Sequence, residues 1–410
     1  MNTIATPLPS SALGDPVSVP QESYPRLFWR FLRFGLLAWG GPVAQIGMIR
    51  HELVEEEKWI SREKFNRVLA VYQVLPGPEA QEMCVYFGML AGGRWGGFLA
   101  GFAFLLPGLL LMLALSWFYI HVGISSPLFA GIFYGMQAVV PALIIRAIHR
   151  IGEHTLTNRW LWTIAIAVAF SQLIGVHFLY SLTLAGLVAL FAHRRSQVLL
   201  FLTGLIFFTL VVITVIKMDE GRHLMAASPI GLTEAAPSLM KLFASGLRSG
   251  LLTFGGAYTV ISFLQHDAVE VGRWMTNAQF LDGLALSGII PAPLIIFATF
   301  VGYLGGGFWG AIVLTVGIFL PAFGFTLIGH RYVEKAISHP SLHSFLEGIT
   351  AGVVGLVAAT ALILLRSALP DLFAFGLFAT GLFLLYYWKN KAVIPVVVLG
   401  AGLSGILVRL

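Results

Sequence analysis

Long apolar segments separated by short polar ones run along almost the whole chain. A helix needs about 20 apolar residues to cross the hydrocarbon core of a bilayer. By this criterion the pattern predicts 13 spans, at 27–49, 65–91, 95–118, 128–148, 160–175, 178–192, 197–216, 240–263, 278–304, 308–331, 344–366, 371–388 and 391–408. A polar stretch lies at 217–238, and a Pro- and Ser-rich stretch without Lys or Arg lies at 1–25. We therefore expect an all-α polytopic membrane protein with a mobile N-terminal tail.

An internal repeat is the strongest organisational signal. Shifting the sequence by 215 residues aligns Gly, Pro, Trp, His and Arg residues of the first half with the same types in the second. The aligned pairs include Arg33 with Arg248, Gly40-Gly41 with Gly255-Gly256, His51 with His266, Trp59 with Trp274, Pro76 with Pro291 and Pro78 with Pro293. Generic apolar similarity would match Leu and Val instead, so chance is a poor explanation.

The repeat divides the chain into two homologous halves. We expect a first copy at 26–192, a linking span and loop at 193–238 and a second copy at 239–410. Each copy holds six predicted spans, and seven crossings separate the two repeat starts. An odd number places the copies in opposite orientations, as in many secondary transporters. This parity argument fails if the span at 65–91 re-enters instead of crossing. The N-terminus is expected in the cytoplasm and the C-terminus in the periplasm.

Composition excludes several classes of protein. The chain of 410 residues is 58% hydrophobic and 11% charged, against about 25% charged in a soluble domain. A soluble enzyme is therefore excluded. The single cysteine, Cys84, cannot form an internal disulfide or a multi-cysteine metal site. We expect no cofactor, no metal and no phosphate-binding loop for ATP. The net charge of +6 indicates membrane orientation rather than nucleic-acid binding.

Two segments resemble the signature of the chromate ion transporter (CHR) family. They are Trp39-Gly40-Gly41-Pro42-Val43-Ala44-Gln45-Ile46 and Leu75-Pro76-Gly77-Pro78-Glu79-Ala80-Gln81. Phe254-Gly255-Gly256-Ala257 and Pro291-Ala292-Pro293 resemble the weaker C-terminal copy of that signature. The resemblance covers about 26–410 and fits the long, two-domain form, although Trp39 replaces the usual Phe. It implies a bacterial inner-membrane protein that exports chromate and confers resistance, with sulfate as the related oxyanion.

The glycine and proline breaks are the first candidates for substrate binding. Interrupted helices expose N–H groups and a partial positive charge at half-helix N-termini, which suits a tetrahedral dianion. Each break lies within a predicted span, where irregular backbone is tolerated only beside protein or a water-filled cavity. Kinks that serve helix packing are the alternative interpretation. The candidate residues are Gly40, Gly41, Pro42, Pro76, Gly77, Pro78, Gly255, Gly256, Pro291 and Pro293.

Four polar side chains near the breaks are further candidates. Arg33 and Arg248 each precede a Gly-Gly pair, and a guanidinium matches oxyanion geometry. Snorkelling to the membrane interface is the alternative for both arginines. Gln45 and Gln81 follow the breaks of the first half, where they would either bind the anion or hold neighbouring helices together.

Glu79 is a candidate for proton coupling. It follows Pro78 in the first turn of a half-helix, where an ionised carboxylate would neutralise the positive end of the dipole. Either Glu79 points away as a helix-start residue, or it is protonated while the anion is bound.

These features favour a secondary transporter that exports chromate, driven by membrane potential, by exchange, or by both. Sulfate or another oxyanion as the main cargo is the alternative within transport. A membrane-embedded enzyme or a passive channel is less favoured, because the intramembrane polar residues cluster at helix breaks. The expected partners are the oxyanion and the lipid bilayer, with no nucleic acid. A homo-oligomer stays open.

Overall fold

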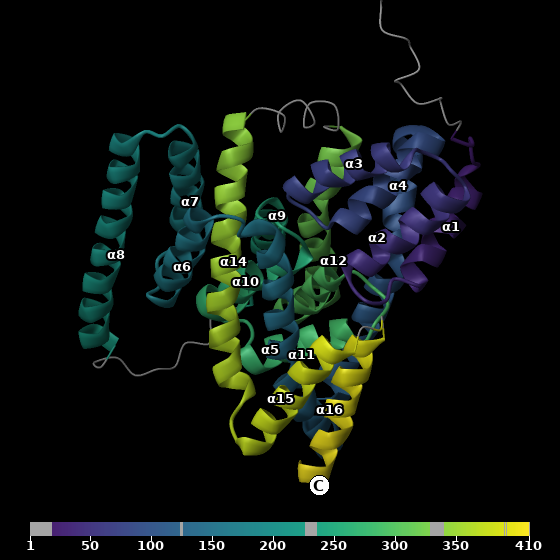
Figure 1. The fold of residues 1–410 in the computed structure, drawn as a ribbon. Helices are drawn as coiled ribbons and strands as arrows, with labels where there is room; N and C mark the ends of the chain where they lie inside the picture. Colours follow the sequence, from purple (N-terminus) through teal and green to yellow (C-terminus); the bar gives the residue numbers. More distant parts are fainter. Residues whose placement is uncertain are drawn as a thin grey trace, which may run out of the picture.

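The computed structural model describes residues 19–123, 126–225, 236–328, 340–388, 390 and 392–409. Most of the predicted tail at 1–25 and part of the polar stretch at 217–238 lie outside these residues. Within them every regular element is helical (Figure 1). The helices of the first half and the linking helix are α1 (Tyr24–Leu36), α2 (Pro42–Arg50), α3 (Arg62–Val74), α4 (Glu79–Phe118), α5 (Pro127–Thr155), α6 (Arg159–Leu173), α7 (Phe178–His193) and α8 (Gln197–Met225).

The second half repeats this order. Its helices are α9 (Leu239–Leu251), α10 (Val260–Gln265), α11 (Asn277–Gly288), α12 (Phe297–Leu327), α14 (Pro340–Ala368), α15 (Leu372–Tyr387) and α16 (Val393–Arg409). Short 3-10 turns lie at Ala257–Thr259 and Leu294–Ile296, and π-helical turns at His51–Glu56, Tyr119–Gly123 and His266–Val271. Side-chain N-caps begin several helices, among them Ser61 at α3 and Ser238 at α9.

Five helical segments are long and apolar enough to cross a membrane. They are Glu79–Gly123, Pro127–Thr155, Gln197–Ile216, Leu294–Leu327 and Pro340–Ala368. Shorter apolar helices lie at Phe178–His193, Leu372–Tyr387 and Val393–Val408. Large apolar side chains such as Phe201, Leu372 and Leu407 are exposed on the outer faces. The chain is therefore a multi-pass membrane protein, although a count of 13 spans is not confirmed.

The predicted spans at 27–49 and 240–263 are interrupted at the predicted Gly-Gly breaks, but they do not continue as single crossings. Each consists of two half-helices that fold back on themselves. In the first, Arg30 in the middle of α1 pairs with Glu57 beyond the end of α2, at 2.5 Å. In the second, Arg248 of α9 pairs with Asp267 beyond α10. The physical cause lies at Gly40-Gly41-Pro42 and Gly255-Gly256, where positive φ angles end one helix before the next begins.

The predicted spans at 65–91 and 278–304 are hairpins as well. Phe65 of α3 stacks on Phe87 of α4 with ring centroids 6.4 Å apart, so the two helices run back along each other from the break at Pro76–Pro78. Phe280 and Phe297 meet in the same way around the second break, at 5.4 Å. Each second hairpin then reverses again at a Gly-Gly pair inside α4 and α12, at 92–93 and 306–307.

The prediction of an inverted repeat is compatible with this correction. Because 27–49 and 65–91 both return to the side on which they start, two of the seven crossings predicted between the repeat starts disappear. Five remain, and the parity is unchanged. An odd number of crossings would leave the two copies in opposite orientations, which stays a prediction, as in many secondary transporters.

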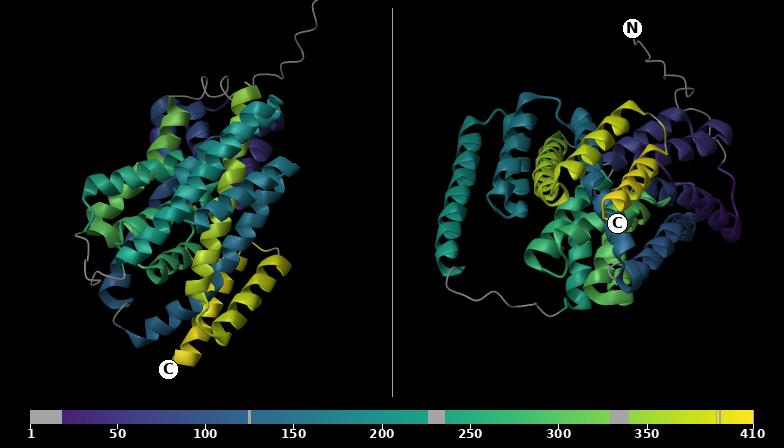
Figure 2. Two further views of the ribbon diagram at one scale, coloured as in Figure 1. Left: turned by 90° about the vertical axis from the view of Figure 1, so that its left-hand side faces the viewer. Right: turned by 90° about the horizontal axis from the view of Figure 1, so that it is seen from below.

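Small residues let the long helices approach closely. A Cβ on Gly135 of α5 would lie 1.9 Å from the Ala401 carbonyl oxygen of α16, and one on Gly355 of α14 would lie 2.0 Å from that of Ala165. Such contacts hold membrane helices together by close packing. The linking helix α8 lies at the outer edge beside α7 (Figures 1 and 2). The other helices pack around the tips of the hairpins.

Candidate functional site

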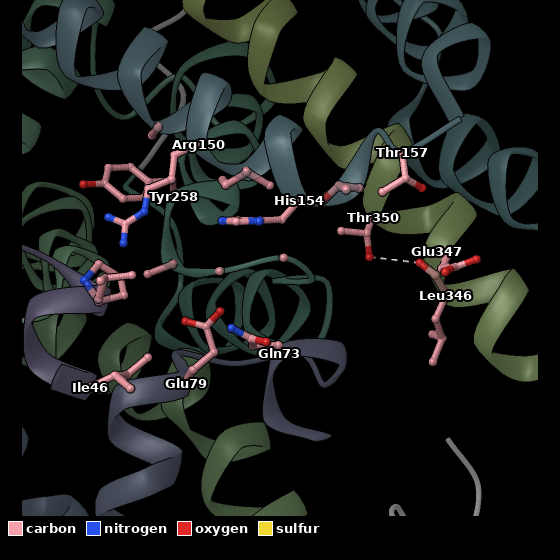
Figure 3. A pocket seen from close by; sticks show the side chains of 18 of the residues that line it. Ile46, Gln73, Glu79, Arg150, His154, Thr157, Tyr258, Leu346, Glu347 and Thr350 are labelled. Atoms are coloured by element: carbon pink, nitrogen blue, oxygen red, sulfur yellow. Dashed lines mark hydrogen bonds between the residues drawn. The ribbon is translucent and has the colours of Figure 1, made fainter. Parts of the chain in front are cut away.

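A cavity of about 540 Å³ lies where the broken hairpins of the two halves meet. Pro42 and Glu79, the first residues of α2 and α4, contribute from the first half. Gly255 to Tyr258 contribute from the second half. The last turns of α5 and the first turns of α14 complete the lining, which Figure 3 shows from close by. The breaks that the sequence singles out therefore share one cavity with residues that lie more than 200 positions away.

Two helix N-termini face this space. Pro42 occupies the first position of α2, with Gly41 as its N-cap, and Glu79 is the first residue of α4, after Pro78. The first N–H groups of a helix have no partner within the helix and carry a partial positive charge. The cavity wall is thereby polarised to attract an anion without any charged side chain.

Arg150 adds a full positive charge. It lies near the C-terminal end of α5 and lines the cavity, with His154 one turn further on. Among the described residues Arg150 forms no ion pair. Figure 3 shows its guanidinium and the Glu79 carboxyl extending into the same space from different walls, with the Gln73 amide close to Glu79. A guanidinium beside helix N-termini is a typical combination for binding a dianion.

The two halves contact each other across their breaks. An ideal Cβ on Gly256 would lie 3.6 Å from Oε1 of Glu79. In the reciprocal contact, an ideal Cβ on Gly41 would lie 3.6 Å from the hydroxyl oxygen of Tyr258. Each glycine thus lies against a polar side chain that the opposite half supplies.

Tyr258 also borders a second, smaller pocket. This pocket of about 30 Å³ includes Gly40, Gly41 and Ser287. Tyr258 lines both spaces, so its ring stands between the large cavity and the residues on the far side of the breaks.

Of the 15 residues predicted from the sequence, four line the large cavity: Pro42, Glu79, Gly255 and Gly256. Gly40 and Gly41 line the small pocket behind Tyr258. Pro76, Gly77 and Pro78 are buried at the base of α4, while Pro291 and Pro293 form the equivalent turn before α12. Neither of the two predicted glutamines lines a cavity. Gln45 is buried and donates to the Ala38 carbonyl oxygen at 2.9 Å, and Gln81 is buried in the first turn of α4.

Arg33 and Arg248 lie outside both cavities and form equivalent ion pairs. Arg33 pairs with Glu52, and Arg248 pairs with Asp267. The acids themselves are 215 residues apart, so the repeat duplicates both partners. Each pair joins the two limbs of a hairpin and so holds the break between them in place.

We expect Arg248→Gln to destabilise the protein more than Arg33→Gln. The Asp267 side chain is 3% exposed and that of Arg248 is 39% exposed, so removal of Arg248 leaves a buried carboxylate whose remaining donor among the described residues is Ser245. The cost should lie between that of an exposed pair and the about 3–5 kcal/mol of a fully buried one. The Arg33 side chain is 55% exposed, and exposed pairs contribute about 0.2–1 kcal/mol. Thermal unfolding of both variants in detergent measures the difference. Equal midpoints would contradict the assignment of Arg248 to a buried pair.

The sequence interpretation missed Arg150, His154, Gln73 and Tyr258. It ended the span on α5 at residue 148, whereas the helix runs to Thr155. The spacing of Arg146, Arg150 and His154 at intervals of four puts them on one helix face, and this pattern was the available signal. Nothing in the sequence shows that Tyr258 of one half meets the break of the other.

Comparison with known proteins identifies the family. The sequence model described as chromate transporter matches residues 25–192 and 240–406. A chromate transport protein of Pseudomonas aeruginosa is 53% identical over 400 residues, covering 95% of this chain and 93% of that protein. A probable chromate transport protein of Synechococcus elongatus is 30% identical over 397 residues, covering 95% and 96%.

A shorter relative matches only part of the chain. The uncharacterized transporter YwrB of Bacillus subtilis is 31% identical over 145 residues, which is 35% of this chain and 73% of that protein. No solved structure matches. The family match extends over both copies of the repeat that form the cavity, and the chain therefore belongs to the chromate transporter family.

Proposed function

We propose that this protein exports chromate across the bacterial inner membrane and so confers chromate resistance. The observation that carries the proposal is the cavity between the two inverted halves, where the N-termini of α2 and α4 lie together with Arg150. Binding sites at broken helices between inverted repeats are a feature of secondary transporters. The relatives named as chromate transport proteins support chromate as the cargo.

The membrane potential is a sufficient driving force. Moving one charge through 100 mV is worth about 2.3 kcal/mol, so a dianion gains about 4.6 kcal/mol when it leaves an interior-negative cell. That free energy sustains a concentration gradient of about 10³. Export therefore needs no ATP, although exchange for protons or another anion would add to the driving force.

We assign the anion-binding role to Arg150 and to the N-termini at Pro42 and Glu79. The glycines Gly40, Gly41, Gly255 and Gly256 shape the wall, while Pro76, Gly77, Pro78, Pro291 and Pro293 hold the second pair of breaks. Arg33, Arg248, Gln45 and Gln81 remain proposals as substrate ligands. Since they line neither cavity, in this conformation their contacts support a part in holding the hairpins instead.

Sulfate is the second candidate cargo. It is also a tetrahedral dianion, and helix N-termini and a guanidinium bind both ions by the same contacts.

An enzymatic function has less support, because the family is a transporter family. Labelled chromate and sulfate flux in proteoliposomes, with voltage and pH gradients imposed separately, tests cargo and driving force together. Absence of saturable chromate flux under every gradient would overturn the proposal.

We expect Glu79→Gln to keep chromate flux driven by voltage but to lose the response to a pH gradient. Glu79 faces the cavity near Arg150 and Gly256, so its charge and that of a bound dianion would repel each other. Protonation of Glu79 would relieve this repulsion, and glutamine mimics the protonated form permanently. Flux at a fixed voltage with and without a pH gradient measures the effect. Glu63→Gln, an exposed change in the first turn of α3, is the control. An unchanged pH response would leave Glu79 a helix-start residue.

A further inference from the structure

Glu82 is a buried carboxylic acid that no donor contacts within the part of the chain that the structure describes. Its side chain is 0% exposed, and neither Oε1 nor Oε2 has a hydrogen-bond partner. An ionised carboxylate in such a place costs far more free energy than a neutral one. Burial without a hydrogen-bond donor therefore favours the neutral acid at Glu82.

The fold does not need an acid at this position. The repeat offset is 215 at Pro78 and Pro293 and 214 at Gly88 and Gly302, so Glu82 aligns with Phe297 or with its neighbour Ile296. Phe297 is fully buried and packs edge-on against Phe280 with ring centroids 5.4 Å apart. The same place in the opposite copy is thus filled by an ordinary apolar side chain. Packing alone would favour an apolar residue at 82, so the carboxyl group requires another explanation.

The second half covers Glu82 through the backbone of Gly77. A Cβ on Gly77 would lie 2.8 Å from Glu82 Oε1 and 3.1 Å from the Ala322 side chain. The Gly77 N–H also donates to the Thr253 carbonyl oxygen at 3.1 Å. We call these contacts of Gly77 with Thr253 and Ala322 the seam. Because Ala322 and Thr253 belong to the second half, movement of the halves relative to each other opens the seam directly above Glu82.

Glu79 is the titratable group that acts on Glu82 electrostatically. The two acids are three residues apart on α4, which places them on one face of the helix. The helix α12 and the turn before it, which pack on α4, contain no Asp, Glu, Lys, Arg or His. Most charged groups on the other helices around α4 have partners among the described residues: Arg30 and Arg33 with glutamates, Arg50 with Glu55, Arg248 with Asp267, and Asp282 with Tyr119 and Gln137. Arg26 of α1 and His121 in the turn after α4 are exposed. The charged residues of α3 lie in its first two turns, away from the break: Arg62, Glu63, Lys64 and Arg67. The other buried titratable side chains near Glu82 are Tyr72, Cys84 and Tyr86.

We propose that Glu82 is a proton-binding residue of the transport cycle, protonated while the seam is closed and ionised only when the seam opens. Glu79 lines the cavity one turn away and relays the proton between Glu82 and water in the cavity. A neutral Glu82 stabilises the closed seam, since closure buries it without a donor. An ionised Glu82 stabilises an open seam that admits water. Proton binding and the conformational change are thereby linked, and this inference rests on the proposed transport function.

Infrared difference spectroscopy of the purified full-length protein tests protonation without any cargo. We expect a carboxylic acid C=O band at neutral pH that shifts in D₂O and is lost in Glu82→Gln. The exposed Glu63→Gln serves as the matched control and should leave the band unchanged. If Glu82→Gln fails to fold, Glu82→Phe introduces the residue of the equivalent position. Persistence of the whole band in the folded variant overturns the proposal.

Chromate flux in proteoliposomes tests the role in the cycle. The probe is labelled chromate at alkaline pH, where the ion in solution is already deprotonated. We expect the part of the flux that depends on a pH gradient to fall at least tenfold in Glu82→Gln, while saturable binding of chromate is retained. A wild-type flux that ignores the pH gradient, or an unchanged response in the variant, overturns the proposal.

The two failures are distinguishable. If the wild-type protein moves no chromate under any gradient, the proposed function fails, and the infrared measurement still decides whether Glu82 holds a proton. If the wild type transports chromate and Glu82→Gln does so with the same pH response, the transport function stands and the role of Glu82 falls.

Discussion

Replacing Arg150 with glutamine should reduce chromate flux at least about 30-fold. Arg150 is the cationic side chain of the cavity that is free of an ion pair among the described residues. Removing one partner of a desolvated charge pair costs about 2–5 kcal/mol, and 2 kcal/mol corresponds to about 30-fold in affinity. Arg150→Lys should retain part of the flux, because lysine keeps the charge but loses the planar fork. Initial rates of labelled chromate efflux at a fixed voltage measure both variants.

Arg366→Gln is the matched control for Arg150→Gln. Arg366 lies in the last turn of α14, the helix whose first turns line the cavity. It is 16 residues beyond Thr350, which is about 24 Å along the helix axis. The control removes the same charge from the same protein without touching the cavity, and its flux should stay close to that of the wild type. Equal losses in the two variants would remove Arg150 from the binding site.

The sequence predicts the fold class and the internal repeat because both depend on periodic signals. Apolar runs report helices, and matched Gly, Pro and Arg residues report duplication. It does not predict that 27–49 turns back, since a broken hairpin and a kinked crossing have the same hydropathy. The deciding contacts, Arg33 with Glu52 and Arg248 with Asp267, are themselves repeated. A pair of opposite charges present in both copies on either side of a Gly-Gly break was thus the signal for a hairpin.

The site is predictable only where local chemistry dictates it. The breaks at Pro42, Glu79 and Gly255-Gly256 line the cavity. They are predictable because glycine and proline interrupt a helix wherever it lies in the fold. Arg150 is different, since only the packing of α5 between the halves brings it to the breaks. Its place depends on contacts between residues more than 60 positions apart. No local pattern encodes such contacts.

Substituting alanine for Gly41 or Gly256 should destabilise the protein and impair transport together. Gly41 has φ 79° and ψ −175°, and Gly256 has φ 111° and ψ 168°. Residues other than glycine essentially do not occupy this region, and strain of this kind costs about 1–3 kcal/mol. At Gly256 the added methyl group would also lie 3.6 Å from Glu79 Oε1. Thermal unfolding in detergent and chromate flux in proteoliposomes should therefore decline in both variants.

Gly47→Ala separates the effect of the break from that of a methyl group. Gly47 lies on the exposed face of α2, well inside the helix, and nothing lies within 4 Å of the position that a Cβ would occupy there. Alanine is favoured over glycine within a helix by about 0.5–1 kcal/mol, so this variant should be as stable as the wild type or more stable. If Gly41→Ala is equally well tolerated, α2 does not need the left-handed N-cap that directs its N-terminus to the cavity. The helix dipole would then lose its place in anion binding, and Arg150 would have to account for the attraction by itself.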